Sequence, residues 1–375
     1  MAGEPGEKRA ADEVRRVPWY RERLPERDDL LELLGDEPAA TLVVTAKSRA
    51  VADGTISVTA PDDQQLAAIA DRAAGAVAKL SAGDDVDLSE DDRAALDLVV
   101  LIVARPALFV QGERVAQPPP NWPAVEADHA LIEANLRGVG CILKAEQAVG
   151  TAVLVDARLM LTNNHVVCGL LGLPFDAWEG ARDAFAKSVD ESNMLWTKTP
   201  GAAPEVDFLR ELGGAEKRRV RVARVAGTHA NADLAILELD AEVANTRVVA
   251  LHPSEPKLLV GGDVYAIGYP VVDCSQLTPL FLLEQIFGAT KTLSTKRLSP
   301  GRLKGLDPPM SLRHDASTLN GSSGSALFDF DTHEMIGLHH AGSFRAKANY
   351  AVPMWKLVAD VLLGKNGIRF SGSVR

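Results

Sequence analysis

The sequence contains little cysteine. Its 375 residues include only Cys141, Cys168 and Cys274, and no two of these lie close enough in the chain to suggest a zinc pair. An odd and sparse set of cysteines also argues against a disulfide framework. The first twenty residues contain no apolar stretch that resembles a signal peptide. Together these absences predict a cytoplasmic protein.

Long hydrophobic runs and an excess of positive charge are also absent. The longest apolar run, residues 96–110, is interrupted by Arg105 and Pro106 and is too short to span a bilayer. The formal net charge of −11 argues against nucleic acid as a partner. We therefore expect neither a membrane nor nucleic acid among the partners of this protein.

A proline-rich stretch, QPPPNWP, divides the chain. Residues 1–36 carry dense charge of mixed sign and predict a solvated arm or helix. Residues 37–116 predict a smaller N-terminal accessory module that is α+β or mostly helical. Residues 117–136 predict a proline-rich linker followed by a short helix. Residues 137–375 predict one larger domain.

The larger domain has a mainly β pattern. Short runs of β-forming residues alternate with turn residues, which is typical of an antiparallel sandwich or barrel. Two segments have helical periodicity instead. One is residues 176–190, within a long connection that begins at Cys168, and the other is residues 355–365 near the C-terminus. We expect a helix in each.

Three polar residues stand beside predicted strands in the order His, Asp, Ser. His165 follows an apolar strand in LTNNHVV, Asp233 precedes another in NADLAILELD, and Ser323 lies in NGSSGSA. This order is one of those known for acyl-transfer triads. In such a triad the imidazole takes the serine proton, while the carboxylate fixes the tautomer and stabilises the imidazolium.

Each of these signals also has a structural explanation when it is taken alone. GSSG is more often a loop, a histidine before two valines is often a packed core residue, and an aspartate before a strand is commonly a cap. The three together, in order, favour the triad. The glycine-rich turn adds the backbone N–H groups of Gly321 and Ser323, which predict an oxyanion hole.

The segments GTAVLVDARLMLTNNHVV, ADLAIL, YAIGYP, TLNGSSGSALFD, MIGLHHAG and NYAVP resemble the trypsin-like (chymotrypsin-fold) serine proteases over roughly residues 137–363. The resemblance implies a mainly β fold of two six-stranded antiparallel β-barrels with the active site between them. It also implies a serine endopeptidase that cuts proteins or peptides through an acyl-enzyme without a cofactor. His165 and Asp233 would belong to the first barrel and Ser323 to the second.

The chain departs from digestive trypsins at two places. Ser322 replaces the aspartate that receives a new N-terminal ammonium group on zymogen cleavage, so that form of activation is not expected. Ser317 stands where trypsin has its acidic pocket residue. Thr318 and His339 instead match a threonine and a histidine of the glutamyl endopeptidases, a bacterial branch, which implies a preference for an acidic residue before the scissile bond. A hydroxyl and an imidazole can both donate to a carboxylate.

The histidine pair and the strand around it complete the predicted substrate site. Successive strand residues point to opposite faces, so His340 is expected to face Asp233 while His339 faces the pocket. We assign both histidines, with Gly342, to substrate binding. A metal site is not expected, because no further ligands stand at a useful spacing.

Two functions remain open from the sequence alone. The first is an active endopeptidase whose N-terminal module regulates it or recruits it to a protein partner. The second is a protease-fold binding module without catalysis. The presence of all three triad residues favours the enzyme.

Overall fold

The computed structural model describes residues 104–271, 292–343 and 348–372, and upstream of these residues 68, 69, 71–79, 88, 89, 91, 92, 95 and 96. The chain divides into two compact units. The first comprises Met1–Ala107, Asp273–Leu293 and Ser343–Ala348. Within it, residues 71–79 are helical, and Lys79 pairs with Asp92 at 2.8 Å. The charged segment 1–36 lies outside the described residues.

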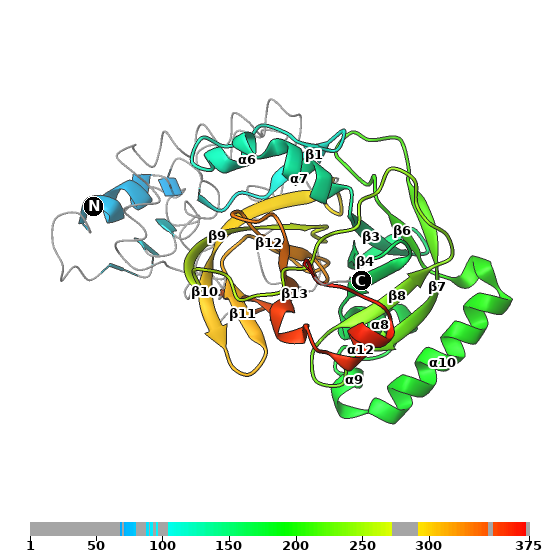
Figure 1. Cartoon of the computed structure of the whole chain (residues 1–375). Helices are drawn as coiled ribbons and strands as arrows, with labels where there is room; N and C mark the ends of the chain where they lie inside the picture. Colours follow the sequence, from blue (N-terminus) through cyan, green and yellow to red (C-terminus); the bar gives the residue numbers. More distant parts are fainter. Residues whose placement is uncertain are drawn as a thin grey trace. The chain divides into compact units, whose positions relative to one another are not determined.

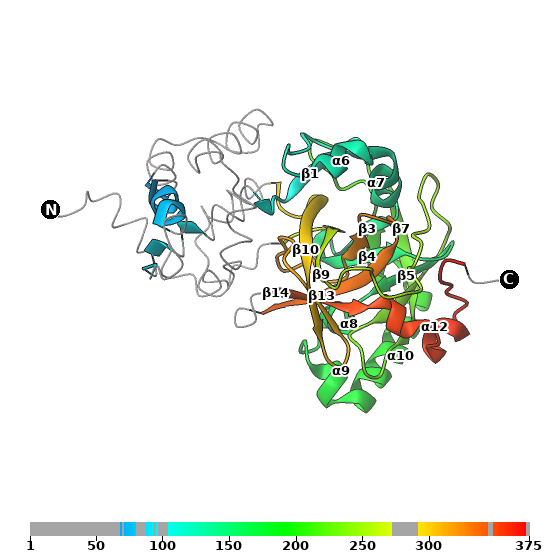
Figure 2. The same ribbon diagram turned by 60° about the vertical axis from the view of Figure 1, so that its left-hand side comes forward.

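The second unit comprises Leu108–Val272, Ser294–Gly342 and Asn349–Arg375. It opens with two strands and two short helices: β1 (Leu108–Gln111), β2 (Arg114–Val115), α6 (Pro123–Ala127) and α7 (His129–Leu136). The helices α6 and α7 lie beside each other at the same edge of this unit in both views (Figure 1, Figure 2). Strand β1 pairs with β10 (Arg297–Asp307), so β1 and β2 extend the sheet of the later strands and do not belong to the sheet of β3–β8.

A first barrel closes in the order β3-β4-β5-β8-β7-β6, with every pair antiparallel. Its strands are β3 (Val139–Lys144), β4 (Gln147–Leu154), β5 (Leu159–Thr162), β6 (Glu205–Asp207), β7 (Arg219–Thr228) and β8 (Ala235–Leu239). Between β5 and β6 the chain forms α8 (Asn164–Leu171), α9 (Ala177–Gly180), α10 (Arg182–Lys198) and the 3₁₀ turn η3 (Pro200–Ala202). The single helix predicted for residues 176–190 is two helices, α9 and α10, which are separated by the non-helical Ala181. Helix α10 lies along the outside of this barrel near β7 (Figure 1).

A second barrel closes in the order β9-β10-β11-β14-β13-β12, because β12 returns to β9 and β10 pairs with β11. Its strands are β9 (Val260–Gly268), β10 (Arg297–Asp307), β11 (Ser311–His314), β12 (Ala326–Asp329), β13 (Met335–Ser343) and β14 (Ala348–Pro353). The predicted pair of six-stranded antiparallel barrels is confirmed.

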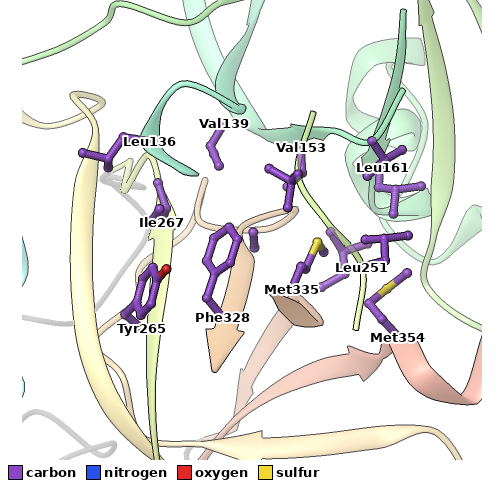
Figure 3. Close-up of a cluster of buried hydrophobic side chains, with 14 of the residues drawn as sticks. Leu136, Val139, Val153, Leu161, Leu251, Tyr265, Ile267, Phe328, Met335 and Met354 are labelled. Carbon is purple, nitrogen blue, oxygen red and sulfur yellow. The ribbon is translucent and has the colours of Figure 1, made fainter. Parts of the chain in front are cut away.

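The two barrels share one apolar cluster. Figure 3 shows Val153 and Leu161 of the first barrel together with Ile267 and Phe328 of the second. Alternation along the strands explains the sharing: on β12, Phe328 faces this cluster, while its neighbour Leu327 faces a separate cluster of the second barrel. Burial of continuous apolar surface across both barrels fixes how they meet, so side chains from both can form one site.

The C-terminal segment differs from the single helix predicted for residues 355–365. It forms a 3₁₀ turn, η5 (Met354–Leu357), and then a separate short helix, α12 (Val361–Lys365). The reason is Asp360, which has an extended backbone and accepts from the N–H groups of Leu362 and Leu363. An aspartate that caps a helix in this way starts a new helix and cannot continue the preceding one.

A buried lysine ties the start of β10 to the first barrel. The ammonium group of Lys296, which has no exposed surface, donates to the carbonyls of Leu136 and Phe208 (2.8 Å each) and lies 3.5 Å from a carboxylate oxygen of Glu211. Burial lowers the pKa of Lys296 to about 8, and the Glu211 carboxylate opposes that shift. The lysine therefore satisfies polar groups that would otherwise be buried without a donor.

We expect Lys296→Ala to lower the free energy of unfolding by about 3–5 kcal/mol, because it leaves a carboxylate buried without its cation. Urea unfolding at neutral pH measures the change. Lys257→Ala is the matched control, since that side chain is 85% exposed and should change stability by less than about 0.5 kcal/mol. Equal effects of the two substitutions would contradict the assigned role of Lys296.

Candidate active site

His165 lies in the first turn of α8, directly after strand β5 and the extended residue Asn163. Its ring nitrogen Nδ1 lies 2.5 Å from Oδ2 of Asp233, and its backbone N–H donates to Oδ1 of the same carboxylate at 3.1 Å. The two side chains are 15% and 12% exposed. A carboxylate bonded both to the ring and to the backbone of one histidine holds that ring in a single orientation.

Two asparagines hold the segment that carries Asp233. The amide of Asn163 donates to the carbonyl of Asp233 (2.7 Å), and the amide of Asn164 donates to the carbonyls of His229 (2.9 Å) and Ala232 (3.1 Å). The asparagine pair in TNNHVV was visible in the sequence, but residue type alone did not indicate its role. The pair connects the histidine-bearing helix to the aspartate-bearing turn.

The turn that carries Ser323 is held against β4 by one residue, Thr151. The N–H of Thr151 donates to the carbonyl of Ser323 (2.8 Å), and its hydroxyl donates to the carbonyl of Gly321 (2.9 Å). The same hydroxyl accepts from the N–H of Tyr269 (3.1 Å), and the carbonyl of Thr151 accepts from the hydroxyl of Thr162 (2.8 Å). A single first-barrel residue therefore fixes the backbone of the serine turn of the second barrel.

Both glycines of the turn are required by close approach and by backbone conformation. Gly321 and Gly324 have φ values of 78° and 87°, in the left-handed region. A Cβ atom on Gly324 would lie 1.9 Å from the carbonyl oxygen of Thr151, and one on Gly321 would lie 2.4 Å from Val271. GSSG is thus a tight turn pressed between two segments of backbone, not a linker.

The two serines of the turn have different surroundings. Ser322 is buried, and its hydroxyl accepts from the N–H of Leu319 at 3.2 Å, so it stabilises the turn itself. Ser323 is only half-buried. Within the part of the chain that the structure describes, no acceptor lies within hydrogen-bond reach of the N–H groups of Gly321 and Ser323.

Gly150 marks where the serine turn and the histidine-bearing helix meet. A Cβ atom on Gly150 would lie 2.8 Å from a methyl group of Val166, the residue after His165, and 3.5 Å from the carbonyl oxygen of Ser323. The structure therefore brings the backbone of Ser323 and the start of α8 to the same point on β4.

His340 lies near the His165–Asp233 pair, on the strand β13. Burial lowers the pKa of His340; the negative charge of Asp233 opposes that shift and the nearby His165 adds to it. The ring of Tyr350 lies beside it, with centroids 6.3 Å apart. A neutral ring at His340 leaves the charge of Asp233 to interact with His165.

His339, on the opposite face of the strand, is buried and belongs to a second histidine pair. Its Nδ1 lies 3.2 Å from Nε2 of His314, a residue that the sequence did not single out. Ser317 is buried, Thr318 is half-buried and Gly342 is exposed. Among the described residues, no cluster of three or more metal-ligating side chains is found.

Phe175 is a further residue that the sequence did not indicate. It lies in the connection between α8 and α9, its side chain is 71% exposed, and its ring centroid lies 5.7 Å from that of His165. Exposure and ring contact are properties of the fold, so sequence pattern alone gave no signal for it.

Comparisons with known proteins agree with this geometry. Residues 150–338 match the family model of the trypsin-like peptidase domain. No curated protein sequence matches the chain. In the described part of the chain no helix is long and apolar enough to cross a membrane.

Several solved structures match this chain at low sequence identity. Deg5 is 20% identical and matches over 64% of this chain and 93% of that chain, with a TM-score of 0.40. The serine endoprotease from Yersinia pestis is 17% identical over 67% of this chain and 69% of that chain, with a TM-score of 0.41. The inactive form of Rv3671c from M. tuberculosis is 17% identical over 69% of this chain and 98% of that chain, with a TM-score of 0.39.

The family match extends over about half of the chain and includes the segments that contain His165, Asp233 and Ser323. It agrees with the closed pair of six-stranded barrels. The chain therefore belongs to the trypsin-like peptidase family and is a serine endopeptidase.

Proposed function

We propose that the protein hydrolyses peptide bonds with a triad of His165, Asp233 and Ser323. The observation that carries the proposal is the bond between His165 Nδ1 and Asp233 Oδ2, at 2.5 Å, on the barrel against which the serine turn is held. This bond leaves Nε2 of His165 to act on the serine hydroxyl. Ser323 is half-buried, whereas Ser322 is buried and its hydroxyl accepts a hydrogen bond from the N–H of Leu319. This difference supports Ser323 as the nucleophile.

The steps follow from these positions. The Oγ atom of Ser323 attacks the scissile carbonyl carbon while its proton passes to Nε2 of His165. The imidazolium then gives that proton to the leaving amine as the C–N bond breaks, which leaves an acyl-enzyme on Ser323. A water molecule then attacks the carbonyl carbon of this ester while its proton passes to Nε2 of His165. The imidazolium returns the proton to Oγ of Ser323 as the ester bond breaks, which frees the acid product and the serine. Throughout, Asp233 stabilises the charged imidazole without taking its proton.

The N–H groups of Gly321 and Ser323 form the oxyanion hole in this proposal. Both belong to the tight turn, and neither has an acceptor among the residues that the structure describes. Two donors that are held in place before the reaction stabilise the developing oxyanion at little reorganisation cost. The contacts of Thr151 with the carbonyls of Gly321 and Ser323 provide that preorganisation.

We propose that the enzyme prefers an acidic residue before the scissile bond. The supporting observation is the buried pair of His339 and His314, whose ring nitrogens lie 3.2 Å apart. A bonded imidazole pair can share a proton and present a donor to a substrate carboxylate, together with the hydroxyl of Thr318 and with Ser317 at the base of the pocket. In this proposal His340 supports the strand from its opposite face, and Gly342 leaves room for the substrate backbone.

Two further proposals concern the role of the N-terminal module and the cellular location of the protein. The N-terminal module, predicted to comprise residues 37–116, regulates the enzyme or recruits it to a protein partner. The protein acts in the cytoplasm, which agrees with the buried free thiols of Cys141 and Cys168, the two cysteines among the described residues.

Ser323→Ala should abolish covalent labelling by a fluorophosphonate and lower kcat by about a thousandfold or more, because the nucleophile is removed. Ser322→Ala, the matched control from the same turn, should still be labelled. Mass spectrometry of the labelled protein reads out both variants. Labelling that survives Ser323→Ala and is lost in Ser322→Ala would overturn the assignment.

His339→Ala should lower kcat/KM about 10- to 100-fold for peptides with Glu before the cut, since a hydrogen bond to a charged group contributes about 1.5–3 kcal/mol. The same variant should change kcat/KM much less for matched peptides with Leu at that position. A library of peptides that differ only at this residue makes the comparison. Cleavage by the wild type mainly after Lys, Arg or large aromatic residues would refute the acidic preference and leave the triad untouched.

Removal of residues 1–104 keeps β1 and all that follows it, and should change the rate, the choice of protein substrates or the binding of partners. Proteome cleavage by the full and shortened chains, followed by mass spectrometry of the products, measures the first two. Affinity purification with both chains measures the third. Identical behaviour in all three measurements, with both chains folded by circular dichroism, would exclude a regulatory or targeting role.

A further inference from the structure

Another histidine–carboxylate pair includes a residue of the turn that leads to Asp233. Nε2 of His229 lies 3.0 Å from Oδ2 of Asp360, and the two side chains are 12% and 17% exposed. His229 belongs to the turn that leads to Asp233, whereas Asp360 lies more than 120 residues later, at the start of α12. Neither residue has a role in the proposed reaction.

The imidazole of His229 organises the turn before Asp233. Its Nδ1 accepts from the backbone N–H groups of Asn231 (3.0 Å) and Ala232 (2.8 Å). A ring nitrogen that accepts two N–H bonds carries no proton, so the ring proton is on Nε2 and is donated to Asp360. The tautomer is thus fixed from both sides.

The same turn also bonds to the helix that carries His165. The carbonyls of His229 and Ala232 both accept from the amide of Asn164, the residue before His165. The backbone of His229 donates to the carbonyl of Leu234, the residue after Asp233, at 2.8 Å. A displaced His229 ring would therefore disturb the position of the Asp233 carboxylate relative to the imidazole.

Asp360 connects this turn to the C-terminal helix. Its Oδ1 accepts from the N–H groups of Leu362 (2.9 Å) and Leu363 (3.1 Å), which leaves Oδ2 for His229. Leu363 is buried in the apolar cluster shared by both barrels, and a Cβ atom on Gly227 of β7 would lie 2.5 Å from Leu362.

We propose that His229 and Asp360 are positioning residues that set the orientation of Asp233 for catalysis and make that orientation depend on the C-terminal helix. This inference rests on the proposed function, because it assigns Asp233 to the reaction. The physical reason is that a catalytic triad tolerates little error in the positions of its groups. A misplacement of about 1 Å can lower the rate about a hundredfold. The His229–Asp360 pair restricts the conformations of the turn that carries the Asp233 carboxylate.

The test uses Asp360→Ser in the full chain. Serine is as good a helix N-cap as aspartate but is too short to reach His229, so the substitution removes the contact and keeps the cap. We expect kcat to fall about tenfold with KM unchanged, because the loss affects the orientation of a catalytic group and not the binding of substrate. His229→Ala should give the same result.

His229→Gln is the conservative variant that separates positioning from folding. Its amide nitrogen can donate to Asp360 from about the position of Nε2, while its oxygen lies one bond farther from Cβ than Nδ1, so it should recover part of the kcat lost in His229→Ala. The control is His252→Ala, which removes a similar pair, His252 Nδ1 with Glu334 Oε2 at 2.7 Å, whose side chains are likewise mostly covered. That variant should keep the kcat of the wild type.

The outcomes separate this inference from the proposed function. If Ser323→Ala is inactive but Asp360→Ser keeps kcat within twofold of the wild type, the positioning role is overturned and the triad stands. An equal fall in kcat for His252→Ala would also overturn it, because the loss of any histidine–carboxylate pair would then lower kcat to the same extent. If Ser323→Ala retains the wild-type rate, it is the proposed function that fails.

Discussion

The docking of the serine turn on Thr151 is the constraint on which the site depends. His165 and Asp233 belong to one barrel, and Ser323 belongs to the other. Apolar packing across the barrels fixes their approach only to the precision of side-chain contacts, whereas hydrogen bonds fix distance and direction. Thr151 contributes both a backbone N–H and a hydroxyl to the turn, so the proposed nucleophile, Ser323, is held on the barrel that carries the proposed base, His165.

Around this contact, buried polar side chains hold neighbouring segments together through hydrogen bonds. Asn163 and Asn164 hold the aspartate-bearing turn, Thr162 bonds back to Thr151, and Lys296 satisfies carbonyls where the second barrel begins. Each of these side chains is buried and donates at least one hydrogen bond, which limits the penalty for burying polar groups, whereas the amide oxygens of Asn163 and Asn164 have no partner among the described residues. The lowered pKa of His340 has a related consequence: a neutral second imidazole next to Asp233 does not compete with His165 for its charge.

Much of the fold could be predicted from the sequence, and the assignment of the main site residues stays a prediction. Short period-two strands and turn residues are local signals that predicted an antiparallel sandwich or barrel, and the resemblance to the trypsin-like proteases implied the two barrels that the pairing of β3–β8 and β9–β14 shows. The glycines of the serine turn were also correctly expected to matter, since φ values of 78° and 87° and contacts under 3 Å leave no room for a side chain. These features are encoded within a few residues.

What could not be predicted depends on residues far apart in the chain. Thr151 is an ordinary strand residue until Gly321 and Ser323 fold against it, and the partners His314 and Asp360 stand 25 and 131 residues from His339 and His229. The same reason explains the single C-terminal helix that was expected at 355–365. Asp360 caps a new helix through Leu362 and Leu363 in the middle of that segment, and its other carboxylate oxygen bonds to His229, 131 residues earlier.

The most direct test is a crystal structure of the enzyme inactivated by a peptidyl phosphonate, which imitates the tetrahedral intermediate. The account predicts a phosphorus–oxygen bond to Oγ of Ser323, with Nε2 of His165 within hydrogen-bond distance of that Oγ. A second phosphonate oxygen should lie within hydrogen-bond distance of the N–H groups of Gly321 and Ser323, and Thr151 should still hold the turn. A phosphonate on another residue, or an imidazole of His165 that is remote from Ser323 in the adduct, would contradict it.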